Sequence, residues 1–198
     1  MEMESKDDFV RRYGLSEVVV GIIGSPVVTM REMSRGQSLR LSLTIFLLVM
    51  LVVMGTVLVD AELAAQLGGS VVVFVVLIPL SFLLLIIQAG VSFGAARLLG
   101  AKGSFSSLLS LLALANVPSL FMAPLVLVSF LPGIAGSVLY GLGSFVLSIW
   151  VMVLVIIAVR ETFQVSTVRA LFICYLPILL LVILIALVAG LAFLLYAQ

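Results

Sequence analysis

Few side chains in this sequence could take part in catalysis. The 198 residues include no histidine and a single cysteine, Cys174, in an apolar run where a thiol is usually inert. The pair Gly143-Ser144 superficially resembles an intramembrane serine protease motif, but a Ser-His dyad requires a histidine. The apolar stretches hold no aspartate pair, and the chain has no phosphate-binding glycine loop. We therefore expect no enzyme, no catalytic residue, no bound metal and no cofactor.

The polar side chains inside the apolar stretches are uncharged, and two of them are amides, Gln88 and Asn116. Asn116 lies two residues before Pro118, and Pro124 follows. Because a proline inside a helix frees a carbonyl, this pattern predicts a kink that Asn116 could help to satisfy. The alternative is a hinge or a small polar cavity for a lipid or a solute. The lack of ionisable groups at membrane depth argues against an ion-coupled transporter.

The composition indicates the solvent in which these groups lie. Hydrophobic residues make up 64% of the chain and charged residues 10%, and the mean hydropathy is +1.44. A soluble domain is about 45–50% apolar and about 25% charged, so a small globule could not bury this surplus. These values exclude a soluble enzyme and a disordered chain, and a net charge of +1 gives no footprint for nucleic acid.

The apolar stretches predict an all-α, polytopic integral membrane protein. A spanning helix needs about 20 mostly apolar residues, and prolines and glycines divide the longest stretch in two. The expected count is five transmembrane helices, which together form a domain over residues 41–198. Their approximate bounds are 41–59, 70–96, 105–131, 137–159 and 170–196.

The basic residues predict the orientation of these five spans. All ten Lys and Arg residues fall before the first span, between the second and third, or between the fourth and fifth. The positive-inside rule then places the N-terminus in the cytoplasm and the C-terminus on the other side. We expect a multi-pass protein of the cell membrane, or of an endomembrane in a eukaryote.

Residues 1–40 form a cytoplasmic segment with two expected interfacial helices. The first carries an amphipathic stripe that includes Leu15, Val19 and Ile22. The second begins at Ser25-Pro26. Either both helices lie on the membrane surface beneath the bundle, or they form a docking surface for a cytoplasmic partner. The residues of that surface would be Leu15, Val19, Ile22, Ser25, Pro26, Arg31 and Arg35.

Small residues at a spacing of four predict close helix packing. The pairs are Gly90 with Gly94, Ser137 with Gly141, and Ala186 with Gly190. Such a pattern does not say whether the contact lies within one chain or between two. A homodimer follows if the face is exposed.

Four local segments carry a family resemblance: residues 23–33 (IGSPVVTMREM), 112–120 (LALANVPSL), 148–161 (SIWVMVLVIIAVRE) and 165–171 (VSTVRAL). They resemble the Yip family, membrane proteins named for their interaction with Rab/Ypt GTPases. The order and spacing of these segments carry the resemblance, which covers about residues 15–196, and the short N-terminus resembles prokaryotic members. The resemblance implies five spans and, by analogy, binding of a small GTPase and a role in membrane trafficking or shaping.

Three functions fit these observations. The first is a non-enzymatic scaffold that organises the membrane or recruits partners. The second is a permease or channel for a small neutral or lipid-like solute, and it depends on Gln88 and Asn116. The third is an accessory subunit of a membrane complex, and it depends on the small-residue face. The expected partners are the lipid bilayer and a second copy or another membrane protein, but no nucleic acid.

Overall fold

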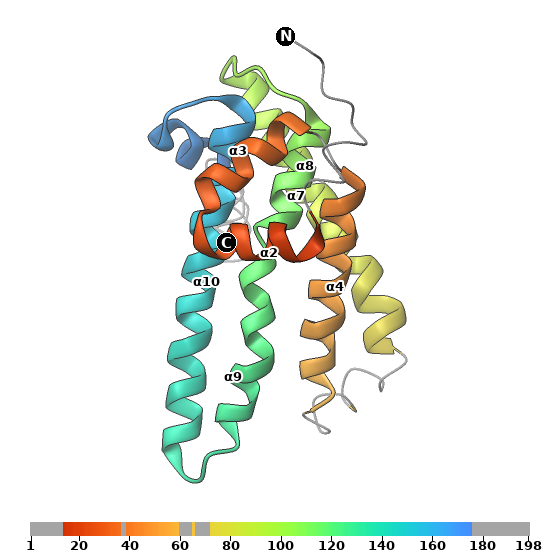
Figure 1. Cartoon of the computed structure of the whole chain (residues 1–198), viewed down its shortest axis with the longest axis vertical. Coiled ribbons are helices and arrows are strands. Elements are labelled where there is room, and N and C mark those ends of the chain that lie inside the picture. Colours follow the sequence, from red (N-terminus) through yellow and green to blue (C-terminus); the bar gives the residue numbers. More distant parts are fainter. Residues whose placement is uncertain (1–13, 37–38, 60–64, 66–71, 176–198) are drawn as a thin grey trace, which may run out of the picture.

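The computed structural model describes residues 14–36, 39–59, 65 and 72–175, and all the regular elements in these ranges are helices (Figure 1). In chain order they begin with α2 (Leu15–Gly24), α3 (Pro26–Gly36) and α4 (Leu39–Val57). A π-helical turn, η1 (Val73–Leu77), leads into α7 (Ile78–Leu98). The remaining elements are α8 (Phe105–Leu114), the 3-10 turn η2 (Val117–Phe121), α9 (Met122–Ser129) and α10 (Ile134–Phe163).

Four helical stretches within the described ranges are long and apolar enough to cross a membrane. They are Leu39–Val57, Phe74–Leu98, Phe105–Ser129 and Ile134–Phe163, and they coincide with the first four expected spans. The fourth is longer than the expected 137–159, because its helix starts directly after Gly133 and continues through Arg160 and Glu161. Only residues 170–175 of the expected fifth span are described, and they belong to a helix that begins at residue 167.

Helix α8 lies at the centre of the bundle. It contacts α3, α4, α7 and α10, and its residues from Ser107 to Leu114 are all buried. Two buried hydroxyl groups, those of Ser42 on α4 and Ser110 on α8, share a hydrogen bond of 2.6 Å. This bond satisfies both hydroxyls where the neighbouring side chains are apolar, as expected for helices that pack inside a membrane.

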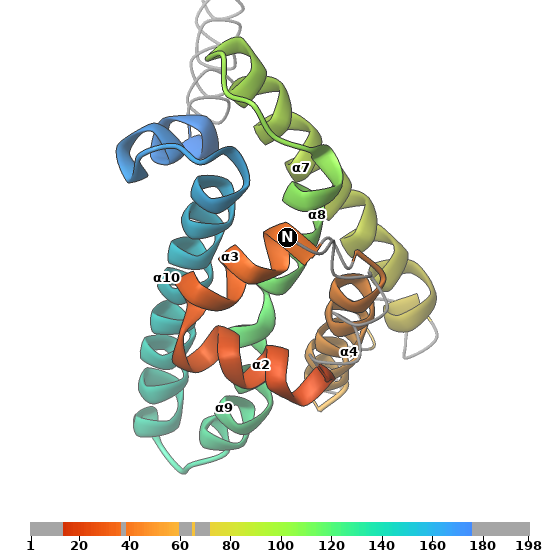
Figure 2. The ribbon, with the colours of Figure 1, turned by 45° about the horizontal axis from the view of Figure 1, so that its top comes forward.

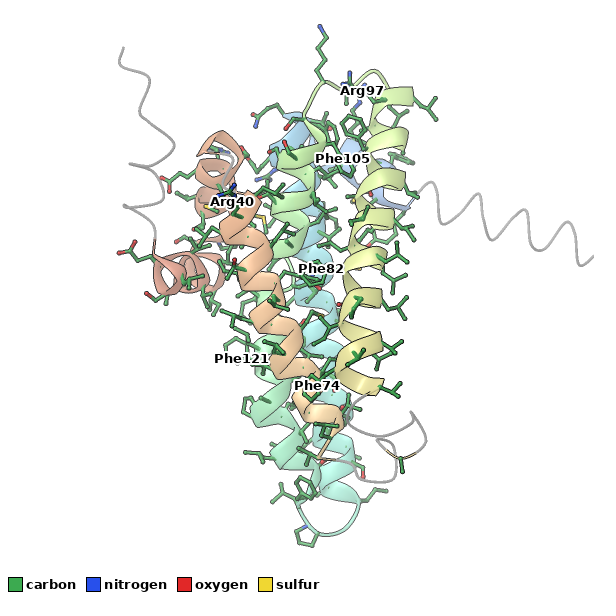
Figure 3. All side chains as sticks on the ribbon, turned by 90° about the vertical axis from the view of Figure 1, so that its right-hand side faces the viewer. Arg40, Phe74, Phe82, Arg97, Phe105 and Phe121 are labelled. Carbon is green, nitrogen blue, oxygen red and sulfur yellow. The ribbon has the colours of Figure 1, made fainter. Side chains whose placement is uncertain are left out.

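The described basic residues gather at one end of the bundle. Arg40 lies in the first turn of α4 and Arg97 in the last turn of α7, and Figure 3 shows both near the same end, with Phe74 towards the other. The start of the fifth helix reaches this end too, because a guanidinium N–H of Arg169 donates to the carbonyl of Leu99. The gathering matches the predicted alternation of the spans, although the side of the membrane on which this end lies stays a prediction.

Helices α2 and α3 form a hairpin that lies across α8, between α10 and α4 (Figure 2). At the close approach of the two helices, a Cβ on Gly21 would lie 2.6 Å from the side-chain oxygen of Thr29. Val18 and Ile22 of α2, and Met30 and Met33 of α3, are buried in the same core as the spans. The hairpin therefore packs against the side of the bundle and completes its core, whereas the sequence suggested a position beneath the bundle.

The turn between α9 and α10 has almost no free space at Gly136. A Cβ at this position would lie 2.7–3.0 Å from the backbone carbonyl oxygens of Leu131, Ser129 and Val128. Gly133 precedes α10 with a φ of 75°, a conformation that favours glycine. These two glycines explain why the chain reverses direction so tightly after Ser129.

We expect Gly136→Ala to destabilise the protein by about 1–3 kcal/mol, since backbone must move to admit the methyl group. The measurement is the unfolding midpoint of the purified protein in detergent. Gly141→Ala is the matched control, because a Cβ at Gly141 meets no described atom within 4 Å. Equal midpoints for the two variants would show that the turn relaxes without cost.

Candidate functional site

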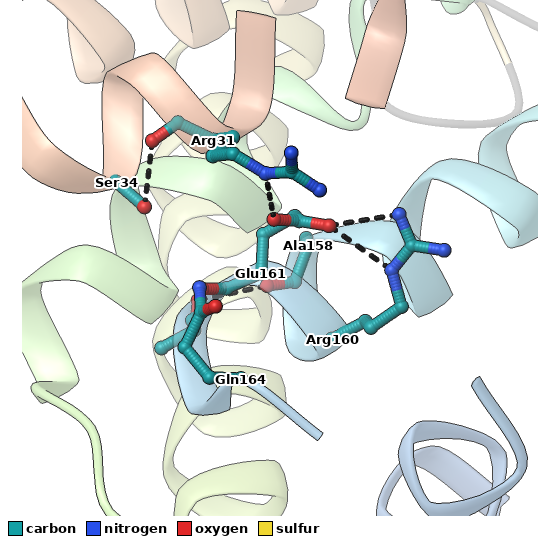
Figure 4. A network of polar contacts seen from close by, with 7 residues as sticks. Arg31, Ser34, Ala158, Arg160, Glu161 and Gln164 are labelled. Atoms are coloured by element: carbon teal, nitrogen blue, oxygen red, sulfur yellow. Dashed lines mark hydrogen bonds and ion pairs between the residues drawn. The ribbon is translucent and has the colours of Figure 1, made fainter. Parts of the chain in front are cut away.

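A buried carboxylate at the basic end of the bundle joins α3 to α10. The side chain of Glu161 is 4% exposed, and both of its oxygens accept hydrogen bonds from arginines (Figure 4). Arg31 donates from Nε to Oε2 at 3.0 Å, while Arg160 donates from Nε and Nη2 to Oε1 at 3.0 and 2.8 Å. A buried carboxylate needs such partners, because burial without them strongly disfavours its charge.

Local sequence features position the three side chains of this cluster. Pro26 begins α3 and fixes its start, so that Met30 and Met33 face the core and Arg31 lies at the edge of that buried face. At the other side, Gln164 adopts a left-handed conformation with φ 52°, and its backbone N–H donates to the carbonyl of Arg160. The last turn of α10 is therefore capped, and Glu161 points toward α3.

The charges of the cluster are unequal, since two guanidiniums surround one carboxylate. The hydrogen bond and the charge of Glu161 raise the pKa of Arg31 above its ordinary value, so Arg31 remains protonated at any physiological pH. Arg31 and Arg160 are 49% and 27% exposed. The cluster thus combines a structural ion pair with cationic groups that reach the surface.

The hairpin divides the predicted partner-surface residues into buried and outward-facing groups. Ile22 is buried, Val19 and Pro26 are half-buried, and Leu15 and Ser25 are exposed. Arg35 lies in the last turn of α3. The most exposed apolar side chains of the hairpin are Val20 and Val28, at 67% and 56%. Binding of a partner at these residues stays a prediction.

The third span breaks at the predicted place. Leu114 ends α8, and Pro118 is buried in the 3-10 turn η2 that follows. The backbone N–H of Asn116 donates to Ala113 instead of Leu112, and its side-chain Nδ2 donates to the vacated Leu112 carbonyl at 2.9 Å. The α-helix is therefore interrupted at this point, and the amide of Asn116 bonds to the backbone.

Pro124 needs no such compensation, because it lies in the first turn of α9, where backbone N–H groups have no hydrogen-bond partner within the helix. Its side chain is exposed on the outside of the helix. The structure therefore does not bring Pro124 and Asn116 together into a polar site.

Gln88 lies apart from this break. It lines a cavity of about 670 Å³ between α7 and α10, to which Cys174 and Tyr175 from the following helix also contribute. Ser92 and Ser148 also line it, and the other lining residues are apolar. Asn116 is not among the lining residues, so the two amides on which the transport hypothesis depends lie at different places in the described part of the chain.

The predicted packing glycines face outward within the described part of the chain. A Cβ added at Gly90, Gly94 or Gly141 would meet no described atom within 4 Å. Gly190 lies outside the described residues. A close approach does occur at Gly143, where an added Cβ would lie 2.4 Å from a side-chain carbon of Leu125 on α9. The packing role of Gly90, Gly94 and Gly141 stays a prediction.

Sequence reasoning missed Glu161 as a site residue. The available signal was a carboxylate directly after Arg160 at the end of a long apolar run, where an acidic group is costly unless it has a partner. Ser42 and Ser110 were missed as well, because a single serine in an apolar helix carries no sign of which helix it faces.

The comparisons with known proteins give one result. A family model described as the Yip1 domain matches residues 20–190. No curated protein and no solved structure matches the chain. The matched range includes the second half of α2, all later described elements and the whole Arg31–Glu161–Arg160 cluster.

Proposed function

Because the chain belongs to the Yip1 domain family, we propose that it is a non-enzymatic membrane scaffold that recruits a cytoplasmic protein through the α2–α3 hairpin. The observation that carries the proposal is the way in which the hairpin is held. One face of it is buried in the bundle core, and Arg31 ties it to Glu161. A rigidly held helix pair with outward-facing apolar side chains provides a preorganised binding surface.

We propose that the protein lies in the cell membrane, or in an endomembrane of a eukaryote, with its N-terminus and the arginine end of the bundle on the cytoplasmic side. Support for this orientation comes from the arginines that gather at the hairpin's end of the bundle. A small GTPase is the partner class that the family analogy implies.

The test is site-specific photo-crosslinking at Val20 and Val28 in the full-length protein in its native membrane. The expected result is a protein adduct from both positions and none from Ile134, which is 81% exposed at the other end of the bundle. A deletion of residues 1–40 would be a poor test, since it removes Val18, Ile22, Met30 and Met33 from the core. Adducts with lipid alone at Val20 and Val28 would contradict the proposal, and purified small GTPases added to the reaction test the named class.

Transport of a small neutral or lipid-like solute is the second candidate, and the cavity beside Gln88 favours it. In reconstituted vesicles, this function predicts that Gln88→Leu abolishes flux. Asn116→Leu should leave the flux per folded protein unchanged, because Asn116 bonds to the backbone and does not line the cavity. Flux that is insensitive to Gln88→Leu would remove the basis of this candidate.

A further inference from the structure

The arginine cluster around Glu161 has more hydrogen-bond donors than its carboxylate can use. A guanidinium carries five N–H donors. Glu161 accepts from Nε of Arg31, and from Nε and Nη2 of Arg160. The two terminal nitrogens of Arg31 and one terminal nitrogen of Arg160 make no further hydrogen bond to the residues that the structure describes. The single negative charge of Glu161 neutralises only one of the two guanidinium charges, so the cluster keeps a net positive charge.

The excess charge lies where a membrane places its headgroups. Helix α10 has 30 residues, about 45 Å at 1.5 Å per residue, whereas the hydrocarbon core of a bilayer is about 30 Å thick. Arg160 and Glu161 stand in the last turn of α10, and charged side chains are costly in hydrocarbon, so we expect the excess length at this end. Arg31 approaches this turn from α3, and the two guanidiniums reach the carboxylate from different sides (Figure 4).

We propose that Arg31 and Arg160 bind the phosphate of an anionic phospholipid headgroup from the adjoining leaflet. The planar guanidinium group matches the geometry of phosphate oxygens, and the N–H groups of both arginines that do not bond to Glu161 can donate to them. Glu161 holds the two guanidinium groups in place and reduces their combined charge to that of one cation, which suits a phosphodiester with one negative charge. The cluster therefore acts as a headgroup site in which Glu161 fixes the positions of the two arginines.

This site is independent of the scaffold proposal, since a partner captured at Val20 and Val28 need not contact a lipid. The test measures lipid adducts on the full-length protein by native mass spectrometry, with phosphatidylglycerol or phosphatidylcholine added to neutral detergent micelles. We expect preferential binding of phosphatidylglycerol. R31Q and R160Q should each weaken it about fivefold, the effect expected for one basic residue at an anionic surface. R40Q is the matched control, because Arg40 carries the same charge at the same end, outside the cluster.

Lipid binding could also fall because the hairpin detaches from the bundle. The variant R160Q distinguishes this explanation from the proposal, because it leaves the Arg31–Glu161 bond in place. In this variant, a cysteine substituted for Met33 should stay as protected from thiol reagents as without R160Q, while lipid binding falls. If R31Q does not fold, R160Q alone decides. Equal lipid binding by R160Q and R40Q would overturn the proposal. If inorganic phosphate displaces no lipid, the result supports the proposal. If inorganic phosphate binds the cluster and the protein does not prefer phosphatidylglycerol over phosphatidylcholine, the lipid assignment is overturned.

Discussion

Replacing Glu161 by alanine should loosen the attachment of α3 to the bundle. The substitution removes the carboxylate to which both arginines donate, and leaves two guanidiniums facing each other beside a buried interface. The measurement is the rate at which a cysteine at Met33, a residue that is 1% exposed, reacts with a water-soluble maleimide. A Cys174→Ser background removes the only native thiol. We expect the labelling rate to rise about tenfold, as local opening exposes the buried face.

Glu17→Ala is the control for this prediction. Its carboxylate accepts a hydrogen bond from the backbone N–H of Gly14 at the start of α2, and is therefore a carboxylate on the same hairpin without a role in its attachment to α10. An unchanged labelling rate in Glu161→Ala would mean that the apolar contacts of Met30 and Met33 hold α3 by themselves. In that case the ion pair would contribute nothing to the rigidity on which the scaffold proposal depends.

Replacing Leu112 by alanine should destabilise the bundle by about 1–3 kcal/mol. Leu112 is buried in α8, the helix surrounded by α3, α4, α7 and α10. In a membrane, lipid solvates the leucine side chain in the unfolded state. The loss of stability in the variant therefore reflects mainly the cavity and the lost packing contacts. The unfolding midpoint in a denaturant titration of the reconstituted protein measures this cost.

The control is Leu83→Ala on α7, where the side chain is exposed on the outside of the bundle. The same atoms are removed there without leaving a cavity, so the midpoint should hardly change. Similar losses for Leu83 and Leu112 would indicate that burial in the structure does not reflect packing within the membrane.

The broad architecture could be predicted from the sequence because lipid imposes simple rules. Uncharged stretches of sufficient length must be helical in a bilayer, and this rule located the first four spans. Local signals are present as well: the hydroxyl of Ser166 accepts from the backbone N–H of Arg169, and serine is a preferred residue at the start of a helix. The break at Pro118 followed from the missing N–H of proline.

The candidate site could not be predicted, because it depends on which helices lie side by side. Arg31 and Glu161 each stand in a segment that resembles the family, yet no periodicity in either segment shows that they meet. The different surroundings of the two amides could not be predicted for a related reason. Asn116 satisfies a carbonyl of its own helix, while Gln88 faces a cavity on α7. Pairings across the bundle require a fold, and one sequence gives only spacing along the chain.

The contact between Arg31 and Glu161 also has a consequence for the order of assembly. The two residues are separated by 130 positions, so α3 leaves the ribosome long before its partner exists. At a translation rate of about 5–20 residues per second, the interval is roughly 10 s. During that time the apolar face of the nascent hairpin must be sheltered by the bilayer surface or by chaperones. Once the fourth span has been synthesised, Glu161 can bind Arg31 and attach the hairpin to the bundle.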